Sequence, residues 1–334
     1  MPQDAADQYF MRAALSMARR GLGNVAPNPA VGCVIVKDGH IIARAHTAPG
    51  GRPHAETQAL QKVDAEAKGA TAYVSLEPCA HHGQTAPCAQ ALIEAGIARA
   101  VIAYTDPDPR VSGKGIEMFE KASIEVTTGV LEKQAQELNR GFILKVTQNR
   151  PLVTLKIATS SDHKIALKGQ RTKISGELAG RYMHLERSMH DAILIGSETA
   201  LIDKPKLTTR IEGIHHDSLR VILDGSGRIQ SEDFYVLTNE SLDTRDIKAV
   251  LAHLAEKGIT RLLVEGGAQI HESFLNAELV DRFLWCKSSQ EIGPQGVEAL
   301  NNLDITRIEE ISGLKHTKTR MLGEDTLEIY ERPL

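Results

Sequence analysis

The sequence predicts an α/β protein made of two folded domains. Short apolar runs typical of strands alternate with amphipathic segments at helical spacing, which indicates a layered architecture with a largely buried sheet. The chain has 334 residues, and at roughly 150 residues per domain this length corresponds to about two domains. A second series of strands and helices begins after the middle of the chain, so we expect the second half to fold as a domain rather than as a tail.

The first half is expected to begin with a helix and then to alternate between strands and helices. Phe10 and Ala18 share one face of the first helix, and residues 37–39 suit a turn between two strands. Pro78 should end a later strand, and Gly96 lies just past the end of a later helix. The expected elements are a helix over 8–20, two strands within 30–45, a helix over 54–63, a strand over 70–78, a helix over 88–97 and a strand over 98–107.

The second half repeats this alternation after a polar stretch at 145–149, which marks the expected domain boundary. The predicted domains are therefore residues 1–147 and residues 148–334. The expected strands cover 152–158, 190–196, 219–225, 233–238 and 261–267, and the expected helices cover 175–190 and 246–257.

Composition and charge disfavour several classes of protein. The formal net charge is -4 and aromatic residues make up 4% of the chain, so a protein that binds nucleic-acid backbones or stacks on bases is not expected. No apolar run reaches the length of a membrane span, and the N-terminal segment lacks the apolar core of a signal peptide. The four cysteines are too few for a disulfide framework. We therefore expect a cytoplasmic protein that binds neither nucleic acid nor membrane.

One histidine and two cysteines are spaced as the ligands of a catalytic zinc ion. His54 is followed by Cys79, directly after Pro78, and then by Cys88. Three nitrogen or sulfur ligands leave a fourth position for water, whereas structural zinc sites are usually closed by four protein ligands. Glu56 lies two residues after His54 and is not needed as a ligand, so its expected role is to move protons at the zinc-bound water.

The local positions of these residues agree with this interpretation. His54 and Cys88 are expected to open helices, and a helix N-terminus favours a thiolate over a thiol. A His-x-Glu followed by Pro-Cys and a second cysteine is the pattern of zinc nucleobase deaminases, although here eight residues separate the cysteines, with His81 and His82 among them. Two alternatives stay open: a histidine of this insert completes a structural zinc site, or the cysteines are merely buried.

The second half carries weaker signals. Residues 265–267, Glu-Gly-Gly, are expected between a strand and a helix, where glycines let a pyrophosphate approach backbone amides, but many ordinary turns also carry glycines. Arg210 could pair with a substrate phosphate through two hydrogen bonds, or it could be a solvated arginine. No dinucleotide fingerprint of the doubly wound type is present. From its residues alone, the second half is therefore not assigned an activity.

Both halves resemble one known family, the bifunctional riboflavin-biosynthesis deaminase–reductases, over nearly the whole chain. The long spacing between the two zinc-site cysteines separates this family from cytidine and tRNA-adenosine deaminases. In the first half the resemblance rests on residues 27–32, His46, residues 53–56, residues 78–88 and the Asp-Pro-Asp-Pro run at 106–109. In the second half it rests on residues 156–162, 196–210, 265–267 and 292–294.

The resemblance implies a cytidine-deaminase-like α/β/α domain followed by a dihydrofolate-reductase-like α/β domain. The first would deaminate a diaminopyrimidinone that carries a phosphoribosylamino arm, with zinc bound by His54, Cys79 and Cys88 and with Glu56 moving protons. The second would use NADPH to reduce the ribosyl arm to ribityl. Carried over by position, the pyrimidine-pocket residues would be Asn28 and His46, the cofactor residues would be Ala158, Thr199, Asp203 and Gly267, and the reductase substrate residues would be Arg171, Leu207, Arg210 and Glu265.

Some positions depart from the family pattern, mainly in the second half. His163 stands where the family usually has glycine, Lys204 replaces the second of two aspartates, and Asp108 replaces an asparagine. The segment 169–175 is shorter and more basic than usual. The departures in the second half are expected either to reshape the reductase pocket or to lower the reductase activity.

Two other functions stay open at this point. A zinc deaminase of nucleosides or of tRNA could use its second half to bind the rest of the substrate, although the acidic balance and the cysteine spacing disfavour it. A non-catalytic zinc module could bind a nucleotide as a regulatory partner, but a purely structural zinc does not need Glu56. We therefore predict a hydrolase and NADPH-dependent oxidoreductase that acts on a small pyrimidine ribotide, with zinc and NADPH as cofactors. We also expect a homo-oligomer formed through the reductase domain.

Overall fold

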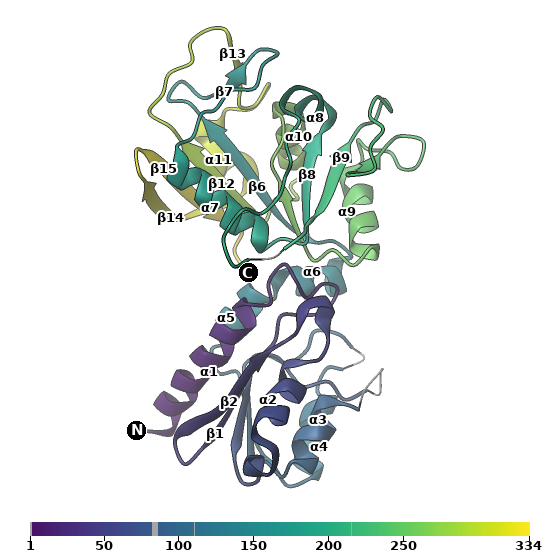
Figure 1. The fold of residues 1–334 in the computed structure, drawn as a ribbon, viewed down its shortest axis with the longest axis vertical. Coiled ribbons are helices and arrows are strands. Elements are labelled where there is room, and N and C mark those ends of the chain that lie inside the picture. The colour runs from purple at the N-terminus through teal and green to yellow at the C-terminus, as the bar shows by residue number, and fades with distance from the viewer. Residues whose placement is uncertain (1, 82–85, 110, 215) are drawn as a thin grey trace. The chain divides into compact units, whose positions relative to one another are not determined.

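The computed structural model describes residues 2–81, 86–109, 111–214 and 216–334. The chain forms two compact units, Met1–Gln148 and Asn149–Leu334 (Figure 1). The polar stretch at 145–149 is not a loose linker, because its first four residues belong to helix α6 (Arg140–Gln148) and the division follows the last residue of that helix.

The first unit is a five-stranded sheet between two layers of helices. The strand order is β2-β1-β3-β4-β5, in which β1 pairs antiparallel with β2 and β3, whereas β3, β4 and β5 run parallel. Besides α6, its helices and strands are α1 (Gln3–Arg19), β1 (Gly32–Lys37), β2 (His40–His46), α2 (Ala55–Val63), β3 (Thr71–Val74), α3 (Cys88–Glu94), β4 (Arg99–Ile102), α4 (Lys114–Lys121), β5 (Glu125–Thr128) and α5 (Glu132–Leu138).

Alternating side chains of β1 show which helices cover each face of this sheet. Cys33 and Ile35 of β1 pack in one cluster with residues of α2, α3 and α4, including Phe119. Val34 and Val36 point to the opposite face and pack with residues of α1 and α5. The result is the α/β/α layering that the family resemblance implies.

The second unit is built on an eight-stranded, mostly parallel sheet in the order β10-β9-β8-β11-β6-β12-β15-β14. Neighbours from β10 to β12 run parallel, and β15 and β14 are added antiparallel at one edge. A separate two-stranded ribbon pairs β13 with β7. The elements are β6 (Leu152–Thr159), β7 (Lys164–Leu167), α7 (Glu177–Ser188), β8 (Ala192–Gly196), α8 (Ser197–Asp203), β9 (Leu219–Leu223), β10 (Tyr235–Leu237), α9 (Ile247–Glu256), β11 (Arg261–Val264), α10 (Ala268–Asn276), β12 (Arg282–Lys287), β13 (Gly296–Glu298), α11 (Ile308–Ser312), β14 (Lys315–Leu322) and β15 (Asp325–Glu331).

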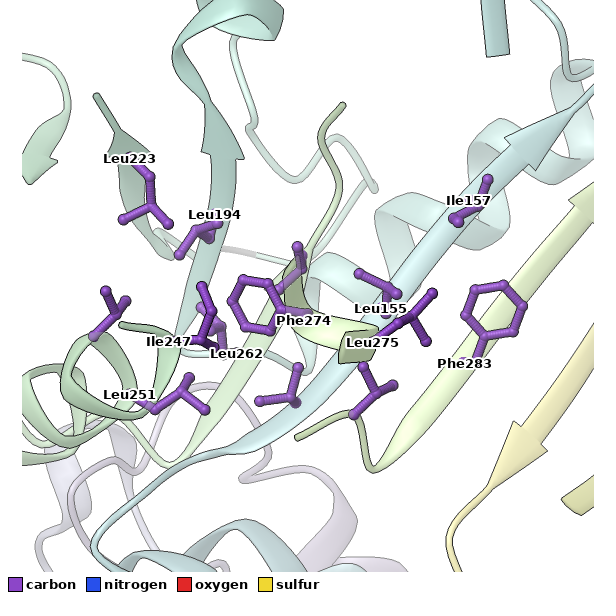
Figure 2. Packing of buried hydrophobic residues seen from close by; sticks show 14 of the residues in the cluster. Leu155, Ile157, Leu194, Leu223, Ile247, Leu251, Leu262, Phe274, Leu275 and Phe283 are labelled. Atoms are coloured by element: carbon purple, nitrogen blue, oxygen red, sulfur yellow. The ribbon is translucent and has the colours of Figure 1, made fainter. Parts of the chain in front are cut away.

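The main core of the second unit lies between one face of this sheet and the helices α9 and α10 (Figure 2). Leu155 and Leu262 project from the sheet toward Leu251 of α9 and Phe274 of α10, and Phe274 is fully buried. Helix α7 covers the opposite face through residues that include Met183. The carboxyl ends of the parallel strands remain available for a binding site, as is usual in open α/β sheets.

Each predicted helix and strand corresponds to an observed element, but two strands are clearly shorter than predicted and several observed elements had no prediction. The strand expected over 98–107 ends at Ile102. The strand expected over 70–78 ends at Val74, because Glu77 bonds to a separate loop and Pro78 has no N–H to donate to a neighbouring strand. Nearly all residues of the edge strand β14 are exposed. Because neither face of this strand is buried, its sequence has no alternating apolar pattern. A strand of that kind is recognised only from its pairing with β15.

Candidate active sites

Three side chains of the first unit converge as a metal-ligand group. His54, Cys79 and Cys88 offer one ligand atom each, and these atoms lie within 4.8 Å of one another. His54 Nδ1 is 3.3 Å from Cys88 Sγ and 3.7 Å from Cys79 Sγ. A tetrahedral zinc ion bonded at about 2.0–2.3 Å keeps its ligand atoms roughly 3.5 Å apart, so the donor set and the spacing both fit zinc.

Local structure brings these ligands together. His54 directly precedes α2, and Cys88 is the first residue of α3, after Pro87 in an extended conformation. Cys79 lies in the loop that follows β3, where its sulfur accepts a hydrogen bond from the Cys88 N–H at 3.4 Å. Two helix starts and one loop after a strand therefore meet at one point, as the sequence pattern predicts.

The two cysteines differ in pKa. The hydrogen bond from Cys88 lowers the pKa of Cys79 to about 4, with the bonds from His54 acting in the same direction. The same contact and burial raise the pKa of Cys88 far above its usual value. The two shifts have opposite directions because the two sulfurs share one contact. A zinc ion bound there would hold both sulfurs as thiolates, so its binding would release protons.

Glu56 adds a carboxyl group beside these ligands. It lies in the first turn of α2 and is 3% exposed, and its Oε2 has no hydrogen-bond partner among the described residues. Burial raises the pKa of Glu56 to about 7, and the charge of Cys79 acts in the same direction. A buried carboxyl with an unfilled hydrogen-bonding position at a metal-ligand group is suited to exchange protons with a small molecule bound there.

The histidines of the insert do not enlarge the ligand group within the described part of the chain. The group has three members there, and His81 is exposed and is not one of them. His82 lies outside the described residues. A closed four-ligand structural site therefore has no support from the residues that are described.

Asn28 and His46 lie on segments that border the start of α2. The Asn28 side chain donates to the Gly51 carbonyl at 2.8 Å, and a Cβ atom at Gly51 would lie 2.2 Å from Asn28 Nδ2. Gln58 of α2 donates to the His46 carbonyl, and His46 Nδ1 bonds to the Thr47 carbonyl at 2.8 Å. Backbone contacts thus hold both side chains near the helix that follows His54.

The second unit contains a cavity of about 1340 Å³ at the carboxyl ends of its central parallel strands. The ends of β6, β8 and β9, the turn directly after β11 and the first residues of α8 and α10 line it. Its volume suits a dinucleotide together with a second small ligand. The predicted cofactor and substrate residues that line it are Ala158, Arg171, Thr199, Asp203, Leu207, Glu265 and Gly267.

Arg210 is the one predicted residue of the second unit that does not line this cavity. Its side chain is exposed, and its Nε donates to His184 Nε2 at 3.3 Å. His184 Nδ1 in turn bonds to the Thr208 carbonyl at 3.1 Å. His184 belongs to α7, so this helix holds the Arg210 side chain outside the lining of the cavity.

The glycine turn between β11 and α10 is required by close packing. A Cβ atom at Gly266 would lie 2.8 Å from Ile195 Cβ, so the turn lies directly on β8. Gly267 has a φ of +80°, which L side chains rarely adopt, and a Cβ atom there would lie 3.2 Å from Thr199 Oγ1. The turn therefore brings backbone N–H groups at the start of α10 next to Thr199.

Glu265 is bound by an arginine that sequence reasoning does not identify. Arg187 of α7 donates from Nε and Nη2 to the two oxygens of Glu265 at 2.6 and 2.7 Å. Burial raises the pKa of Glu265, but the hydrogen bonds and charge of Arg187 outweigh it and hold the pKa below its usual value. Both residues line the cavity. No local pattern marks Arg187, because its partner is distant in the sequence.

Two of the departures from the family pattern have a structural explanation. His163 has a φ of +62°, in the left-handed region that glycine adopts without strain, and its ring lies 5.7 Å from that of Trp285. Burial raises the pKa of Asp203, and the charge of Arg171 opposes this rise, so the basic segment lies near the proposed cofactor residue. The cavity is therefore present, and Arg171 and Lys173 of this segment are among the residues that line it.

These two sites define a class of protein, a zinc-dependent deaminase joined to a reductase. Residues 4–104 match the cytidine and deoxycytidylate deaminase zinc-binding region, and residues 151–327 match the RibD C-terminal domain. The chain belongs to the RibD family, the bifunctional deaminase–reductases of riboflavin biosynthesis. It is therefore a hydrolase and an NADPH-dependent oxidoreductase with a zinc-binding deaminase domain. The alternative functions are not favoured by these matches.

Similar proteins match over nearly the whole chain. The riboflavin biosynthesis protein RibD of Aquifex aeolicus is 36% identical over 98% of both chains, and that of Escherichia coli is 32% identical over 96% of this chain and 97% of the other. The structure of Acinetobacter baumannii RibD, form 2, has a TM-score of 0.89 at 33% identity and covers 99% of this chain and 100% of that one. A Thermotoga maritima diaminohydroxyphosphoribosylaminopyrimidine deaminase/5-amino-6-(5-phosphoribosylamino)uracil reductase has a TM-score of 0.86 at 33% identity and covers 99% of both chains.

The hydropathy of the helices bears on membrane insertion. None of those in the described residues combines the length and the hydropathy that crossing a bilayer requires.

Proposed function

We propose that the first predicted domain, residues 1–147, carries out the deamination and that the second, residues 148–334, carries out the reduction. The metal-ligand group with Glu56 in the first unit and the dinucleotide-sized cavity in the second unit support this division. The proposed substrate of the first step is the pyrimidine ribotide named for the Thermotoga maritima enzyme.

In the first unit, His54, Cys79 and Cys88 would hold the zinc ion. Zinc bound there supplies an activated water by lowering its pKa. Glu56 Oε2 would accept a proton from the attacking water and pass it to a ring nitrogen as the new C–O bond forms. It would then take the second proton from the new hydroxyl group on that carbon and pass it to the amino group, which leaves as ammonia when the C–N bond breaks. The observation that carries this proposal is the buried Oε2 atom with no partner among the described residues, next to three converging ligands.

Asn28 and His46 would orient the pyrimidine. Both are held by backbone carbonyls near the start of α2, which supports a fixed position for each side chain. Orientation of this kind brings the amino-bearing carbon and the catalytic groups together without further loss of freedom during the reaction.

In the second unit, NADPH supplies the hydride, and the chain holds the cofactor and the ribosyl arm close to each other. Ala158, Thr199, Asp203 and Gly267 would contact the cofactor. Arg171, Leu207 and Glu265 would contact the substrate, with Glu265 kept ionised by its pair with Arg187. Arg210 would meet the phosphate only where the substrate arm extends beyond the cavity, because it is not among the lining residues.

The test separates chemistry from metal binding. Glu56→Gln keeps the size of the side chain and leaves the three ligands unchanged, so zinc content should stay the same. Release of ammonia from the diaminopyrimidine ribotide should fall at least about a hundredfold, as on loss of a general acid–base group. Oxidation of NADPH with pre-deaminated substrate should continue. A variant that loses both activities, or that loses zinc, would contradict the assignment.

The further assignments concern assembly and location. The exposed strand β14 at the edge of the large sheet supports a homo-oligomer formed through the second unit, since such edges pair readily with other strands. The formal net charge of -4 supports a protein that does not bind nucleic acid. The four free cysteines support a cytoplasmic location. Sedimentation of the full chain tests the assembly, and a monomer at all concentrations would contradict it.

A further inference from the structure

Glu77 is a buried acid that immediately precedes the Pro78–Cys79 pair. It is 3% exposed, although it belongs to a loop rather than to a strand or helix. All four of the hydrogen bonds that its carboxylate accepts within the described residues come from backbone N–H groups. Backbone donors of this kind stabilise a buried carboxylate in place of a cation.

The four donors lie on either side of residue 110, at Asp106 and within residues 113–116. Oε2 accepts from Asp106 at 3.1 Å and from Gly113 at 3.0 Å. Oε1 accepts from Gly115 at 2.9 Å and from Ile116 at 3.4 Å. The latter two lie in the first turn of α4, whose cap residue Gly113 has no side chain that could satisfy them. Glu77 therefore caps α4 from a different segment of the chain.

Close packing joins the same two segments. A Cβ atom at Gly115 would lie 2.3 Å from the Pro78 carbonyl oxygen, so the first turn of α4 rests directly on the backbone next to Cys79. Burial raises the pKa of Asp106 to about 6, and the charges of Asp108, Glu77 and Cys79 act in the same direction. Asp106 thus lies within electrostatic reach of a metal ligand.

We propose that Glu77 is a positioning residue of the deaminase. It joins the loop that carries Cys79 to Asp106 and to the start of α4, and so holds a zinc ligand and Asp106 in one fixed arrangement. The inference rests on the proposed zinc site. A carboxylate is needed because each of its oxygens can accept from two donors. A glutamine would present an NH₂ group to one pair of N–H donors.

The test is Glu77→Gln in the full chain. We expect zinc content to stay at the wild-type level and the reductase rate to be unchanged. Deaminase kcat/KM should fall roughly 10- to 100-fold, as on loss of groups that orient metal ligands. In cobalt-substituted protein the absorption bands of the metal should shift, because Cys79 changes its position. Wild-type protein assayed in parallel must release ammonia in a zinc-dependent way, which separates failure of this inference from failure of the proposed site.

Two further variants serve as controls. In Gly115→Ala the added Cβ atom would clash with the Pro78 carbonyl oxygen, so the start of α4 must move away from the cysteine loop. This variant should therefore reproduce the kinetic and spectral changes, even where Glu77→Gln folds poorly. Asp7→Asn removes another buried carboxylate of the same unit. Arg99 and Tyr73 bind Asp7, and the cysteine loop does not. This variant should therefore lower stability without changing KM, kcat or the cobalt spectrum.

Two results would overturn the inference. The first is wild-type kinetics and an unshifted cobalt spectrum in Glu77→Gln. The second is an equal loss of activity in Asp7→Asn at a matched fall in Tm, since the effect of Glu77 would then be one of stability alone.

Discussion

The ion pair between Arg187 and Glu265 allows a quantitative prediction for the second unit. Arg187→Met keeps a long apolar side chain but removes the two hydrogen bonds, of 2.6 and 2.7 Å, to Glu265. The side chains of the two residues are only 15% and 9% exposed, so solvent replaces little of what is lost. Removing one partner of a buried pair costs roughly 3–5 kcal/mol. We expect about 3 kcal/mol, near the lower end, because both residues line a cavity that admits water.

The dependence of this loss on pH follows from the pKa of Glu265. In the wild type, burial raises this pKa, but Arg187 outweighs burial, so the folded-state pKa lies below the unfolded value of 4.5. The stabilisation is therefore present above pH 4.5 and is lost as the pH falls through the folded-state pKa. In Arg187→Met burial dominates and the pKa should rise above 4.5. The difference in unfolding free energy between wild type and variant should then be largest in mildly alkaline solution and shrink as the pH falls.

The single tryptophan makes the measurement specific to this unit. Trp285 of β12 is 3% exposed, and no other tryptophan is present in the chain. Urea unfolding followed by its fluorescence therefore reports on the second unit within the full chain. A loss below about 1 kcal/mol, the range of an exposed pair, would refute the reasoning, as would an equal loss at acidic and alkaline pH. Arg307→Met, which breaks an exposed pair with Glu310, is the matched control and should leave the unfolding curve unchanged.

Three further predictions concern the two sites. Cys88→Ser should lose most of its zinc in elemental analysis, whereas Cys286→Ser in the second unit should keep it; full zinc content in Cys88→Ser would mean that the ligand is wrongly assigned. Gly267→Ala adds a Cβ atom at a φ of +80° and 3.2 Å from Thr199 Oγ1. The turn should shift away from Thr199 to relieve a strain of roughly 1–3 kcal/mol, and NADPH titration should show affinity reduced about tenfold, or ~1.4 kcal/mol; unchanged affinity would argue against a cofactor at this turn. Glu265→Ala should slow reduction and leave ammonia release nearly intact, and a loss of both activities would speak against two separate sites.

Local patterns in the sequence were sufficient to predict the metal-ligand group of the first unit. His54 directly precedes α2, Cys88 begins α3 and Cys79 follows β3, so the local backbone places the three side chains close together. The strands and helices with strong apolar periodicity were predictable for the same reason, because burial of one face imposes a period on the sequence. The glycine turn at 265–267 lies between a strand and a helix, as its residues indicate.

Contacts between distant segments were not predictable in this way. Nothing near Arg187 in the sequence indicates that it binds Glu265, and nothing near Arg210 indicates that α7 holds it outside the lining of the cavity. The pairing of β14 with β15 likewise leaves no periodic trace, because β14 is exposed.

The sequence by itself therefore determined the class of fold and predicted the group formed by His54, Cys79 and Cys88 with Glu56 beside it. These features depend on local positions at the starts of helices and the ends of strands, or on periodic burial. Only the tertiary structure decided what Glu77, Glu265 and Arg187 contact. A hydrogen bond or ion pair between segments exists only once the order of strands in the sheet has brought the two segments together. That order is a property of the whole packed unit, because every strand and helix must bury its apolar face at the same time.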